Sequence, residues 1–437
     1  MKNRTLALFL LLAAEQLAFL VFFPPVIEPD SFSYMAAAAQ ARDSGGFSSE
    51  VRLPGYPAFL SVFYLVCGQH QLPVIIFQHL LGLLLWFVFM RMLETDRQKA
   101  VFSAFYFCDL LYSSYQHAIL SDFLFSFLLC MSAWPAWLYA RERRARWLFL
   151  CGLLVALGML TKPALKLFPF FLLPVFLAAK LPLRRRLAGA AVFLAAPLLA
   201  VNLWSLKNYL DKGYYSLLPQ ESRHYIGRVV NHIEFPANSV TREYFLAQLP
   251  EGKVSRDRKA PAVLAALDAM DKAGLKAEVV DAECRQIFRL SILRRPFSYL
   301  KESGVELFYF FFSAHNLYAK YALNDRLPVS AEAGLRSGDL PGLALKILVS
   351  LHPFYWLLFA LLAWFTAVNA RGLAADRNFF MLYAYGLIAY IALVSSMTNE
   401  GLARYRCAIQ PLMLYISALA LARIFPGVSG KSAGGVV

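Results

Sequence analysis

Charged residues are scarce in this chain: Asp, Glu, Lys and Arg make up 16% of its 437 residues, whereas a soluble domain has about a quarter. The shortage is matched by an excess of apolar residues, which make up 59% of the chain. These residues gather in runs of about 17–25, the length of helix that crosses a bilayer. The proportions argue against a soluble protein and predict an all-α, polytopic membrane protein.

Motifs for nucleotide, hydrolase or metal chemistry are missing. The sequence contains no GxGxxG, no Walker loop and no GxSxG, so nucleotide-binding and serine-hydrolase functions lack support. It has six cysteines but no CxxC and no zinc-type spacing. Only Cys67 and Cys284 fall in predicted outer segments, where either a disulfide or two free thiols fits the sequence. No internal repeat of the kind found in many transporters is visible.

Acidic residues are fewer than basic ones, 28 against 43, and the formal net charge is +15. The Lys and Arg residues recur in every second loop, which is the pattern of cytoplasmic loops in membrane proteins. We therefore expect no nucleic-acid partner and both termini in the cytoplasm. Basic inner loops also fit an archaeal or eukaryotic membrane, but the short loops and small size favour a bacterial inner membrane. The long segments 26–70 and 207–342 then face the periplasm or exterior, and long loops are usually functional.

We predict about ten membrane-spanning helices from length and apolar content. They cover residues 5–25, 71–92, 99–116, 119–140, 147–162, 165–180, 186–206, 343–369, 377–397 and 404–424. Two shorter apolar pieces, 56–67 and 304–313, are predicted as helices at the membrane surface. The chain divides into an N-terminal transmembrane module (1–206), a large outer loop with a helical insertion broken at Gly274 (207–342), and C-terminal transmembrane helices (343–437).

The first apolar run is predicted to be an uncleaved helix. It extends past Glu15 to Ile27, and no small-x-small cleavage site precedes Pro24. A carboxylate inside a membrane helix is costly in lipid. We therefore expect Glu15 to face the helix bundle and to form a hydrogen bond there.

The first outer loop, 26–70, carries a concentrated set of polar and aromatic residues. Asp30 stands just beyond the first apolar run, and Tyr34 follows one helical turn later, so both can face the same way. The segment RLPGYP then places Arg52 and Tyr56 among prolines that stiffen the chain. Local chemistry leaves two interpretations open: Asp30 caps the helix that follows it, or it belongs to a polar site at the membrane surface.

Several short motifs follow one another along the chain. DSFSYMAAAA (with Asp30, Tyr34 and Ala38) is followed by RLPGYP, FQHLLGLLLW (Gln78), LSDFLFSFLL (Asp122), LTKPALKLFP (Lys162), LKNYLDKGYYSL (Lys207) and NEGLARYRCAIQP (Arg404). In this order and in these loops, the chain resembles the C-type glycosyltransferase superfamily (GT-C). The resemblance is to the bacterial branch related to protein O-mannosyltransferases and lipid A aminoarabinose transferases. Asp122 stands where that family often has Glu, and Lys207 where it has Arg.

The resemblance implies an enzyme that transfers a hexosyl or pentosyl group from a polyprenyl-phosphate or polyprenyl-diphosphate carrier, in bacteria usually undecaprenyl. The acceptor, a lipid, glycan or protein, would be modified on the outer face. Such a reaction uses a base for the acceptor hydroxyl, and Asp30 is the predicted base, with inversion at the anomeric carbon. Fixed cations stabilise the leaving phosphate. The candidates are Arg404, Lys162, Arg52 and Lys207, with Tyr34, Tyr56, Asn208, Tyr405, Asp122 and His224 as further substrate-binding residues.

Other possibilities remain open from the sequence. Asp30, His117 and Asp122 are candidate ligands for a divalent cation such as Mg or Mn. The segment ESRHYIGRVVNH, 221–232, is also compatible with an O-antigen-ligase-like enzyme, and a lipid flippase or secondary transporter is the third alternative. Transporters usually place charges at the membrane midplane. Lys166 and Arg406 are expected to be interfacial charges that reach lipid headgroups.

Overall fold

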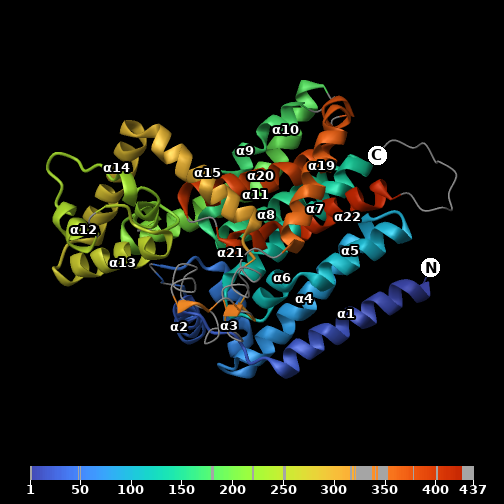
Figure 1. Cartoon of the computed structure of the whole chain (residues 1–437), viewed down its shortest axis with the longest axis horizontal. Helices are drawn as coiled ribbons and strands as arrows, with labels where there is room; N and C mark the ends of the chain where they lie inside the picture. The colour runs from blue at the N-terminus through green and yellow to red at the C-terminus, as the bar shows by residue number, and fades with distance from the viewer. Residues whose placement is uncertain are drawn as a thin grey trace.

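The computed structural model of the chain is an assembly of helices joined by short loops (Figure 1). It describes residues 2–47, 49, 51–178, 182–218, 221–249, 252–314, 317–318, 320, 337–339, 341–342, 353–376, 378–399 and 402–425. Within these ranges there is no β-strand, only a single parallel bridge between Val26 and Ala118. The all-α prediction is confirmed.

The N-terminal part supplies the helices that surround the first outer loop. They are α1 (Lys2–Phe22), α2 (Pro29–Ser44), α3 (Gly55–Cys67), α4 (Gln71–Met92), α5 (Asp96–Cys108), α6 (Leu110–Gln116), α7 (Ser121–Glu142) and α8 (Ala145–Thr161). The chain continues through η1 (Pro163–Leu165), α9 (Phe168–Phe171), α10 (Leu173–Ala178) and α11 (Leu183–Lys212).

The outer insertion follows and lies to the left in Figure 1. It comprises η2 (Glu221–Arg228), η3 (Val230–His232), α12 (Arg242–Gln248), α13 (Arg256–Lys272) and α14 (Ala277–Arg294), and α15 (Pro296–Phe312) follows it. It has a small apolar core of its own, which includes Phe245, Met270 and Ile287. Gly274 separates α13 from α14 with a positive φ of 78°, as its predicted role as a helix break requires.

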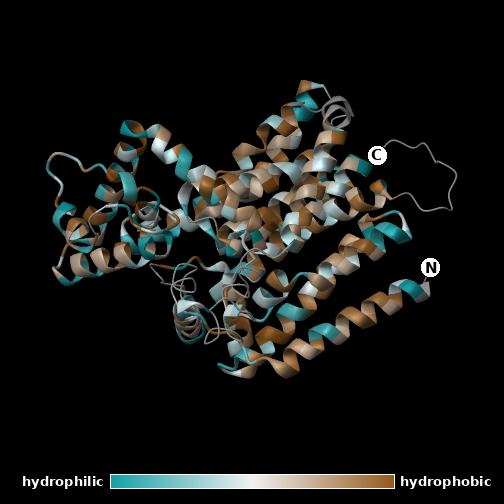
Figure 2. Ribbon diagram, viewed as in Figure 1, coloured by the Kyte–Doolittle hydropathy of each residue, from teal (hydrophilic) through white to brown (hydrophobic). Residues whose placement is uncertain are grey.

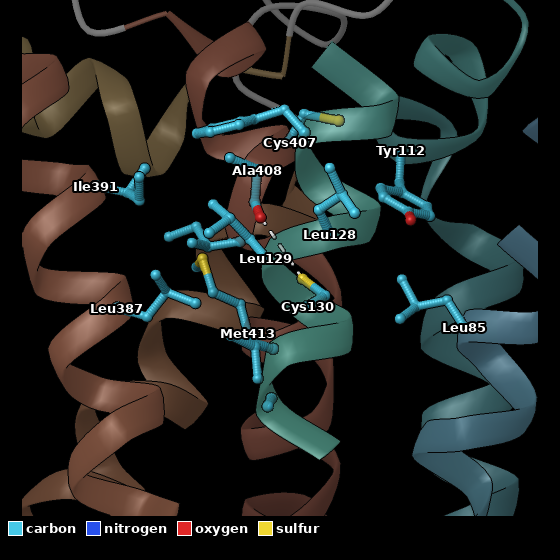
Figure 3. Close-up of a cluster of buried hydrophobic side chains, with 14 of the residues drawn as sticks. Leu85, Tyr112, Leu128, Leu129, Cys130, Leu387, Ile391, Cys407, Ala408 and Met413 are labelled. Carbon is cyan, nitrogen blue, oxygen red and sulfur yellow. Dashed lines mark hydrogen bonds between the residues drawn. The ribbon is translucent and has the colours of Figure 1, made fainter. Parts of the chain in front are cut away.

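The C-terminal part packs back against the N-terminal helices. It contains α19 (Pro353–Asp376), α20 (Phe379–Thr398), α21 (Ala403–Arg406), η5 (Cys407–Ile409) and α22 (Gln410–Ile424). Figure 3 shows where Leu129 of α7, Leu387 of α20 and Met413 of α22 meet in the main apolar core. In the same core, the Cys130 thiol lies 3.5 Å from the carbonyl of Ala408.

Seven helices in the described residues are long and apolar enough to cross a membrane, and the chain is a multi-pass membrane protein. They are Arg4–Phe22, Gln71–Met92, Ser121–Glu142, Leu183–Lys212, Pro353–Ala370, Phe379–Thr398 and Ala403–Ile424. Hydrophobic residues follow these helices in Figure 2, and hydrophilic residues gather in the insertion. The predicted spans 147–162 and 165–180 correspond to shorter apolar helices, and the first part of span 343–369 lies outside the described residues.

The prediction of one continuous helix over 99–116 is wrong. The helix breaks between α5 and α6 at Asp109, which is buried and accepts a hydrogen bond from the backbone N–H of Tyr112 at 3.2 Å. An Asp carboxylate competes for backbone donors and so starts a new helix instead of continuing the old one. The expectation for Glu15 is met only in part, because the half-buried side chain has an Oε2 atom without a hydrogen-bond partner.

The helices predicted at 56–67 and 304–313 are present as α3 and as part of α15. Cys67 and Cys284, for which the sequence left a disulfide open, are both free. Cys284 is buried within the core of the insertion, whereas Cys67 is the last residue of α3. The two thiols therefore do not tie the insertion to the first outer loop.

Candidate active site

The start of α2 sets the position of Asp30. Pro29 occupies the first position of the helix and Glu28 the N-cap, with the Glu28 N–H donating to Ser31 Oγ at 2.9 Å. Proline suits this position because its missing N–H would have no helical partner anyway. The interpretation of Asp30 as a helix cap is therefore wrong, since Glu28 takes that position and the Asp30 carboxylate interacts elsewhere.

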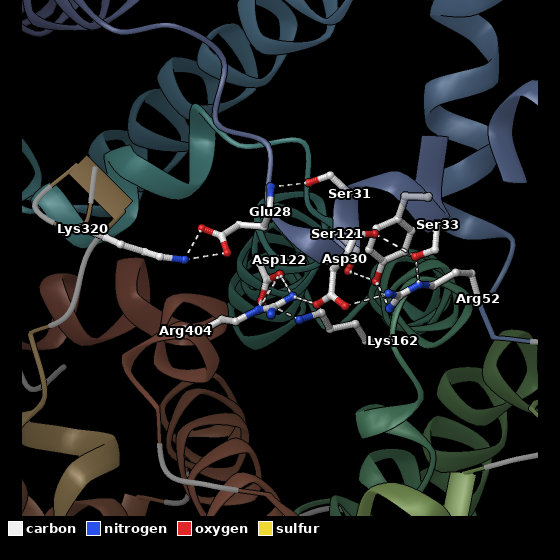
Figure 4. Close-up of polar contacts among 11 residues, drawn as sticks. Glu28, Asp30, Ser31, Ser33, Arg52, Ser121, Asp122, Lys162, Lys320 and Arg404 are labelled. Carbon is white, nitrogen blue, oxygen red and sulfur yellow. Dashed lines mark hydrogen bonds and ion pairs between the residues drawn. The ribbon is translucent and has the colours of Figure 1, made fainter. Parts of the chain in front are cut away.

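Asp30 forms two ion pairs with residues far away in the sequence (Figure 4). Its Oδ1 lies 2.8 Å from Arg52 Nη2, and its Oδ2 lies 2.9 Å from Arg404 Nη2. The Asp30 side chain remains 38% exposed, so a hydroxyl from outside can still reach it. Asp30 thus combines a fixed position with access, as a group that meets a substrate must.

Arg404 joins Asp30 to a second carboxylate. Its Nε lies 3.1 Å from both carboxylate oxygens of Asp122, at the start of α7, while its Nη2 bonds Asp30. Lys162 Nζ also bonds Asp122, at 2.6 Å. Only 1% of the Asp122 side chain is exposed, and a carboxylate so deeply buried requires such pairing. We call Asp30, Asp122, Arg52, Lys162 and Arg404 the charge cluster.

The turn after α8 brings Lys162 to Asp122. Lys162 leaves the helix in an extended conformation, with its N–H bonded to the Gly158 carbonyl, and Pro163 then begins η1. A residue before proline is disfavoured in helical conformation, so the sequence TKP ends α8 at this point. The side chain that follows Thr161 is thereby directed at the buried carboxylate.

Arg52 is held by a set of hydroxyl groups. Its Nε donates to Ser33 Oγ at 2.7 Å, and its guanidinium lies 4.2 Å from the ring centroid of Tyr34. The Tyr34 hydroxyl is 2.7 Å from Ser121 Oγ, and its ring packs edge-on against Tyr56. Both tyrosines are buried, so in this structure they support Arg52 and line no open surface.

The pKa of Asp30 reflects its two cationic partners. Burial raises the pKa of this carboxyl, but the guanidinium groups of Arg404 and Arg52 outweigh that effect and hold it below its usual value. Asp30 is therefore ionised at neutral pH. Removing either guanidinium must raise its pKa.

An apolar groove of about 310 Å³ begins beside the charge cluster. It is lined by Pro54, Gly55, Ala58, Leu124, Leu128, Leu157, Leu160 and Thr161 from α3, α7 and α8. Thr161 directly precedes Lys162, and Leu124 is two residues after Asp122. Gly55 permits this arrangement, because a Cβ there would lie 2.5 Å from Thr161 Oγ1 and 2.7 Å from the Leu160 carbonyl oxygen.

The other predicted site residues are placed differently. Lys207 bonds the Phe47 carbonyl at 2.8 Å and Asp211 at 2.6 Å, and Asn208 bonds the carbonyls of Ser216 and Leu217. Both fix the start of the large outer loop and do not enter the charge cluster. The Tyr405 ring centroid lies 5.8 Å from Lys162 Nζ. The side chain of His224 lies outside the described residues.

The candidate metal ligands do not form a metal site. His117 is buried, with Nδ1 3.0 Å from His79 Nε2 and Nε2 2.9 Å from the Phe23 carbonyl oxygen. The carboxylates of Asp30 and Asp122 are occupied by cationic side chains. In the part of the chain that the structure describes, no three His, Cys, Asp or Glu residues are placed to hold an ion.

Two sequence predictions about basic residues are corrected or refined. Arg406 does not reach lipid headgroups: it is fully buried, and its Nη1 donates to the carbonyls of Phe310 and Phe311 at the end of α15. Lys166 is exposed, and its contact with lipid headgroups stays a prediction. The cations of ESRHYIGRVVNH lie within the insertion, where Arg223 pairs with Asp271 and Arg228 donates to Ser303.

One ion pair near Asp30 was not predicted from the sequence. Lys320 Nζ lies 2.8 Å from both carboxylate oxygens of Glu28, two residues before Asp30 (Figure 4). The only sequence signal was the acid-proline pair that precedes α2, and Lys320 lies in a segment without any recognisable motif.

Comparisons with known proteins agree with the predicted resemblance. Residues 52–205 match the family described as dolichyl-phosphate-mannose-protein mannosyltransferase. This segment holds Arg52, Asp122 and Lys162 as well as the whole apolar groove. The resemblance to protein mannosyltransferases, predicted from the sequence motifs, is confirmed over these residues. No match was found among curated proteins.

A comparison with solved structures also gave matches. The archaeal oligosaccharyltransferase AglB from Archaeoglobus fulgidus, in complex with an inhibitory peptide and a dolichol-phosphate, has a TM-score of 0.49 and 12% identity over 99% of this chain. This chain spans 53% of AglB, about half its length. ArnT from Cupriavidus metallidurans gives 0.40 and 14% in the apo state, over 95% of this chain and 78% of ArnT. Bound to undecaprenyl phosphate, it gives 0.41 and 15%, over 97% and 79%.

Proposed function

We propose that this chain is a membrane glycosyltransferase that transfers a sugar from a polyprenyl-phosphate carrier to a hydroxyl acceptor, with the charge cluster as its reaction centre. The observation that carries the proposal is the position of Arg404, which bridges an accessible carboxylate and a buried one beside an apolar groove. A charged headgroup and an apolar chain can therefore be bound side by side. The match to mannosyltransferases over residues 52–205 supports the same class of reaction.

The charge of the cluster favours a carrier with one phosphate. Three cations and two carboxylates leave one net positive charge, with Asp122 held by two of the cations. A sugar phosphodiester carries one negative charge and becomes a doubly charged phosphate monoester when the glycosidic bond breaks. Arg404, Lys162 and Arg52 would stabilise the charge that develops, as preorganised cations do in phosphate chemistry.

Asp30 would take the proton of the acceptor hydroxyl. The acceptor oxygen attacks the anomeric carbon, the bond from that carbon to the phosphate oxygen breaks, and the proton passes to the Asp30 carboxylate. One displacement of this kind inverts the anomeric configuration. When the donor phosphate draws Arg404 toward itself, Asp30 loses part of its cationic neighbourhood and its pKa rises toward the range in which it is an effective base.

The groove would hold the first isoprene units of the carrier. Its lining residues are almost all apolar and it runs between α3, α7 and α8 from the charge cluster. We propose that the cluster faces the outer side of a bacterial inner membrane, with both termini cytoplasmic, because the predicted spans put the basic loops on the cytoplasmic side. The acceptor would then arrive from the aqueous phase while the carrier stays in the bilayer.

The proposal is tested by mass spectrometry of envelope glycolipids and glycoproteins from a host that lacks this gene. We expect one mass increment of a hexose or pentose to disappear on deletion and to return with the wild-type gene. The modified molecule in the same spectrum identifies the acceptor. An unchanged set of glycans in the deletion strain, measured under conditions in which the wild-type host makes the protein, would contradict the proposal.

Filling the groove is expected to weaken donor binding. Leu157→Trp places a large side chain in the groove, so the KM for the lipid-linked donor should rise about tenfold or more, as expected when about 1.4 kcal/mol of binding is lost. Leu153→Trp is the matched control, because Leu153 is on the same helix, is also exposed and does not line the groove. Equal KM values for the two variants would show that the groove does not bind the carrier.

Removing Arg52 is expected to shift the pH dependence of the reaction. Arg52 lowers the pKa of Asp30, so Arg52→Gln raises that pKa and the acidic limb of the kcat/KM profile moves to higher pH. Arg42→Gln is the control, because Arg42 lies on α2, the helix of Asp30, but pairs with the exposed Asp43. An acidic limb that stays in place in Arg52→Gln would mean that the limb reports a group other than Asp30.

A further inference from the structure

Helix α15 turns its charged face inward. Glu302 and Glu306 lie one helical turn apart, and both point toward the outer insertion. Lys259 Nζ bonds Glu302 at 2.8 Å, and Arg256 Nε bonds Glu306 at 3.1 Å. Arg228, fully buried, donates to Ser303 on the same face of α15. The side of α15 that packs on the insertion is therefore held by ion pairs and hydrogen bonds.

The opposite face of α15 is uncovered and mainly apolar, with the exposed Lys301 among its apolar side chains. Phe297 is 85% exposed, Leu300 57%, Val305 48% and Phe308 42%. Their spacing of three, five and three residues places them on one side of a helix. We call these four side chains the outer stripe of α15.

This arrangement is the reverse of that expected for a helix whose outer face contacts water. A helix on the surface of a soluble domain buries its apolar stripe and exposes its charges. Exposed apolar stripes mark contacts with a partner or a membrane. The buried ion pairs with the insertion rule out a simple rotation of α15, because turning the stripe inward would expel Glu302 and Glu306 from their partners.

The stripe continues into a membrane-spanning helix. Phe308 packs against Trp356 of α19 with ring centroids 5.8 Å apart, and Phe312 at the end of α15 lies 4.1 Å from the same ring. Trp356 is itself partly exposed and belongs to the apolar span Pro353–Ala370. Tryptophan is favoured at the boundary of a bilayer. The uncovered surface of α15 and the lipid-facing surface of α19 are thus continuous.

We propose that the outer stripe of α15 is a lipid-binding surface, and that α15 lies in the bilayer interface and holds the insertion against the membrane. Lipid acyl chains cover the outer stripe. On the other face of α15, the ion pairs of Glu302 and Glu306 hold the insertion to the helix. Figure 1 shows the consequence: α15 runs from the insertion to the helices that bear the charge cluster. Its far end is bound by Arg406, two residues from Arg404. This proposal does not depend on the proposed enzymatic function.

The test measures how fast single cysteines react with a membrane-impermeant maleimide. In a Cys67→Ala, Cys108→Ala background, Phe297→Cys, Leu300→Cys and Phe308→Cys are introduced one at a time. Leu264→Cys on α13 is the control, because Leu264 is also apolar and 61% exposed. The proteins are studied in phospholipid nanodiscs, which leave both membrane faces accessible, with one copy of the chain in each disc so that a second copy cannot cover the stripe.

We expect the three stripe thiols to react about tenfold or more slowly than the control, because lipid excludes the reagent and disfavours the thiolate. Nitroxide labels at the same positions should collide more often with oxygen than with a water-soluble nickel chelate, and the label at position 264 should show the opposite. The proposal would be overturned if the stripe thiols reacted with the maleimide at rates within a few-fold of the control. It would also be overturned if the nitroxide labels on the stripe collided more often with the nickel chelate than with oxygen.

Discussion

Asp30→Asn is expected to abolish sugar transfer while the protein still folds. The amide keeps the size of the side chain and can still accept a hydrogen bond from Arg52, but it cannot take a proton. Loss of a positioned base costs about 10²–10⁴-fold in rate. We therefore expect kcat for a purified donor and acceptor to fall by that factor, with little change in the KM for the donor.

The control for this variant is Asp43→Asn. Asp43 lies on the same helix, is exposed and pairs with its neighbour Arg42, so its replacement should leave kcat unchanged. Asp30→Glu should retain part of the activity, because it keeps a carboxylate. If Asp30→Asn restores in a deletion strain every glycan that the wild-type gene restores, Asp30 is not a base. The transporter and ligase alternatives would then gain support.

Arg404→Gln is expected to remove activity and to lower stability. Arg404 bonds Asp30 and both oxygens of Asp122, and Asp122 is almost completely buried. Removing one partner of a buried ion pair costs about 3–5 kcal/mol. Because Lys162 still pairs with Asp122, we expect a loss near the lower end of that range. Thermal unfolding of the purified protein measures the stability, and single-turnover transfer from a labelled donor measures the activity.

A double variant separates the two effects of Arg404. In Arg404→Gln with Asp122→Asn, no buried carboxylate is left with a missing partner, so most of the lost stability should return. Activity should not return, because the cation that faces the donor phosphate is still absent. A double variant that recovers both would show that Arg404 is needed only to neutralise Asp122.

The charge cluster was largely predictable from the sequence, and the reasons are physical. Four of its members lie at or near helix ends beside apolar runs: Asp30, Arg52, Lys162 and Arg404. A charged residue is easily recognised there because the neighbouring sequence is apolar. Asp122, predicted as a substrate-binding residue, proved to be the buried partner that holds two of these cations. Their mutual contacts could not be derived from the sequence, because they join different helices and loops that are 22 to 374 positions apart.

The incorrect predictions concern residue types whose usual placement in membrane proteins differs from their placement in this structure. An arginine at the end of an apolar helix usually reaches toward headgroups, but Arg406 is buried because the carbonyls that end α15 need a donor. An Asp within an apolar run fits either a continuous helix or a break, and only the packing around Asp109 decides between them. Likewise, the sequence of α15 shows two faces but not which of them points inward.

The contact between Asp30 and Arg404 joins residues that are 374 positions apart. The ribosome therefore releases Asp30, Arg52, Asp122 and Lys162 long before the last helices are made. In a chain of which only the first half has been inserted, Asp122 can pair with Lys162 but not with Arg404. Arg404, which links Asp122 to Asp30, has not yet been made. If the proposed function is right, a partly made chain should transfer no sugar before α21 has entered the membrane, because Arg404 is part of the proposed reaction centre.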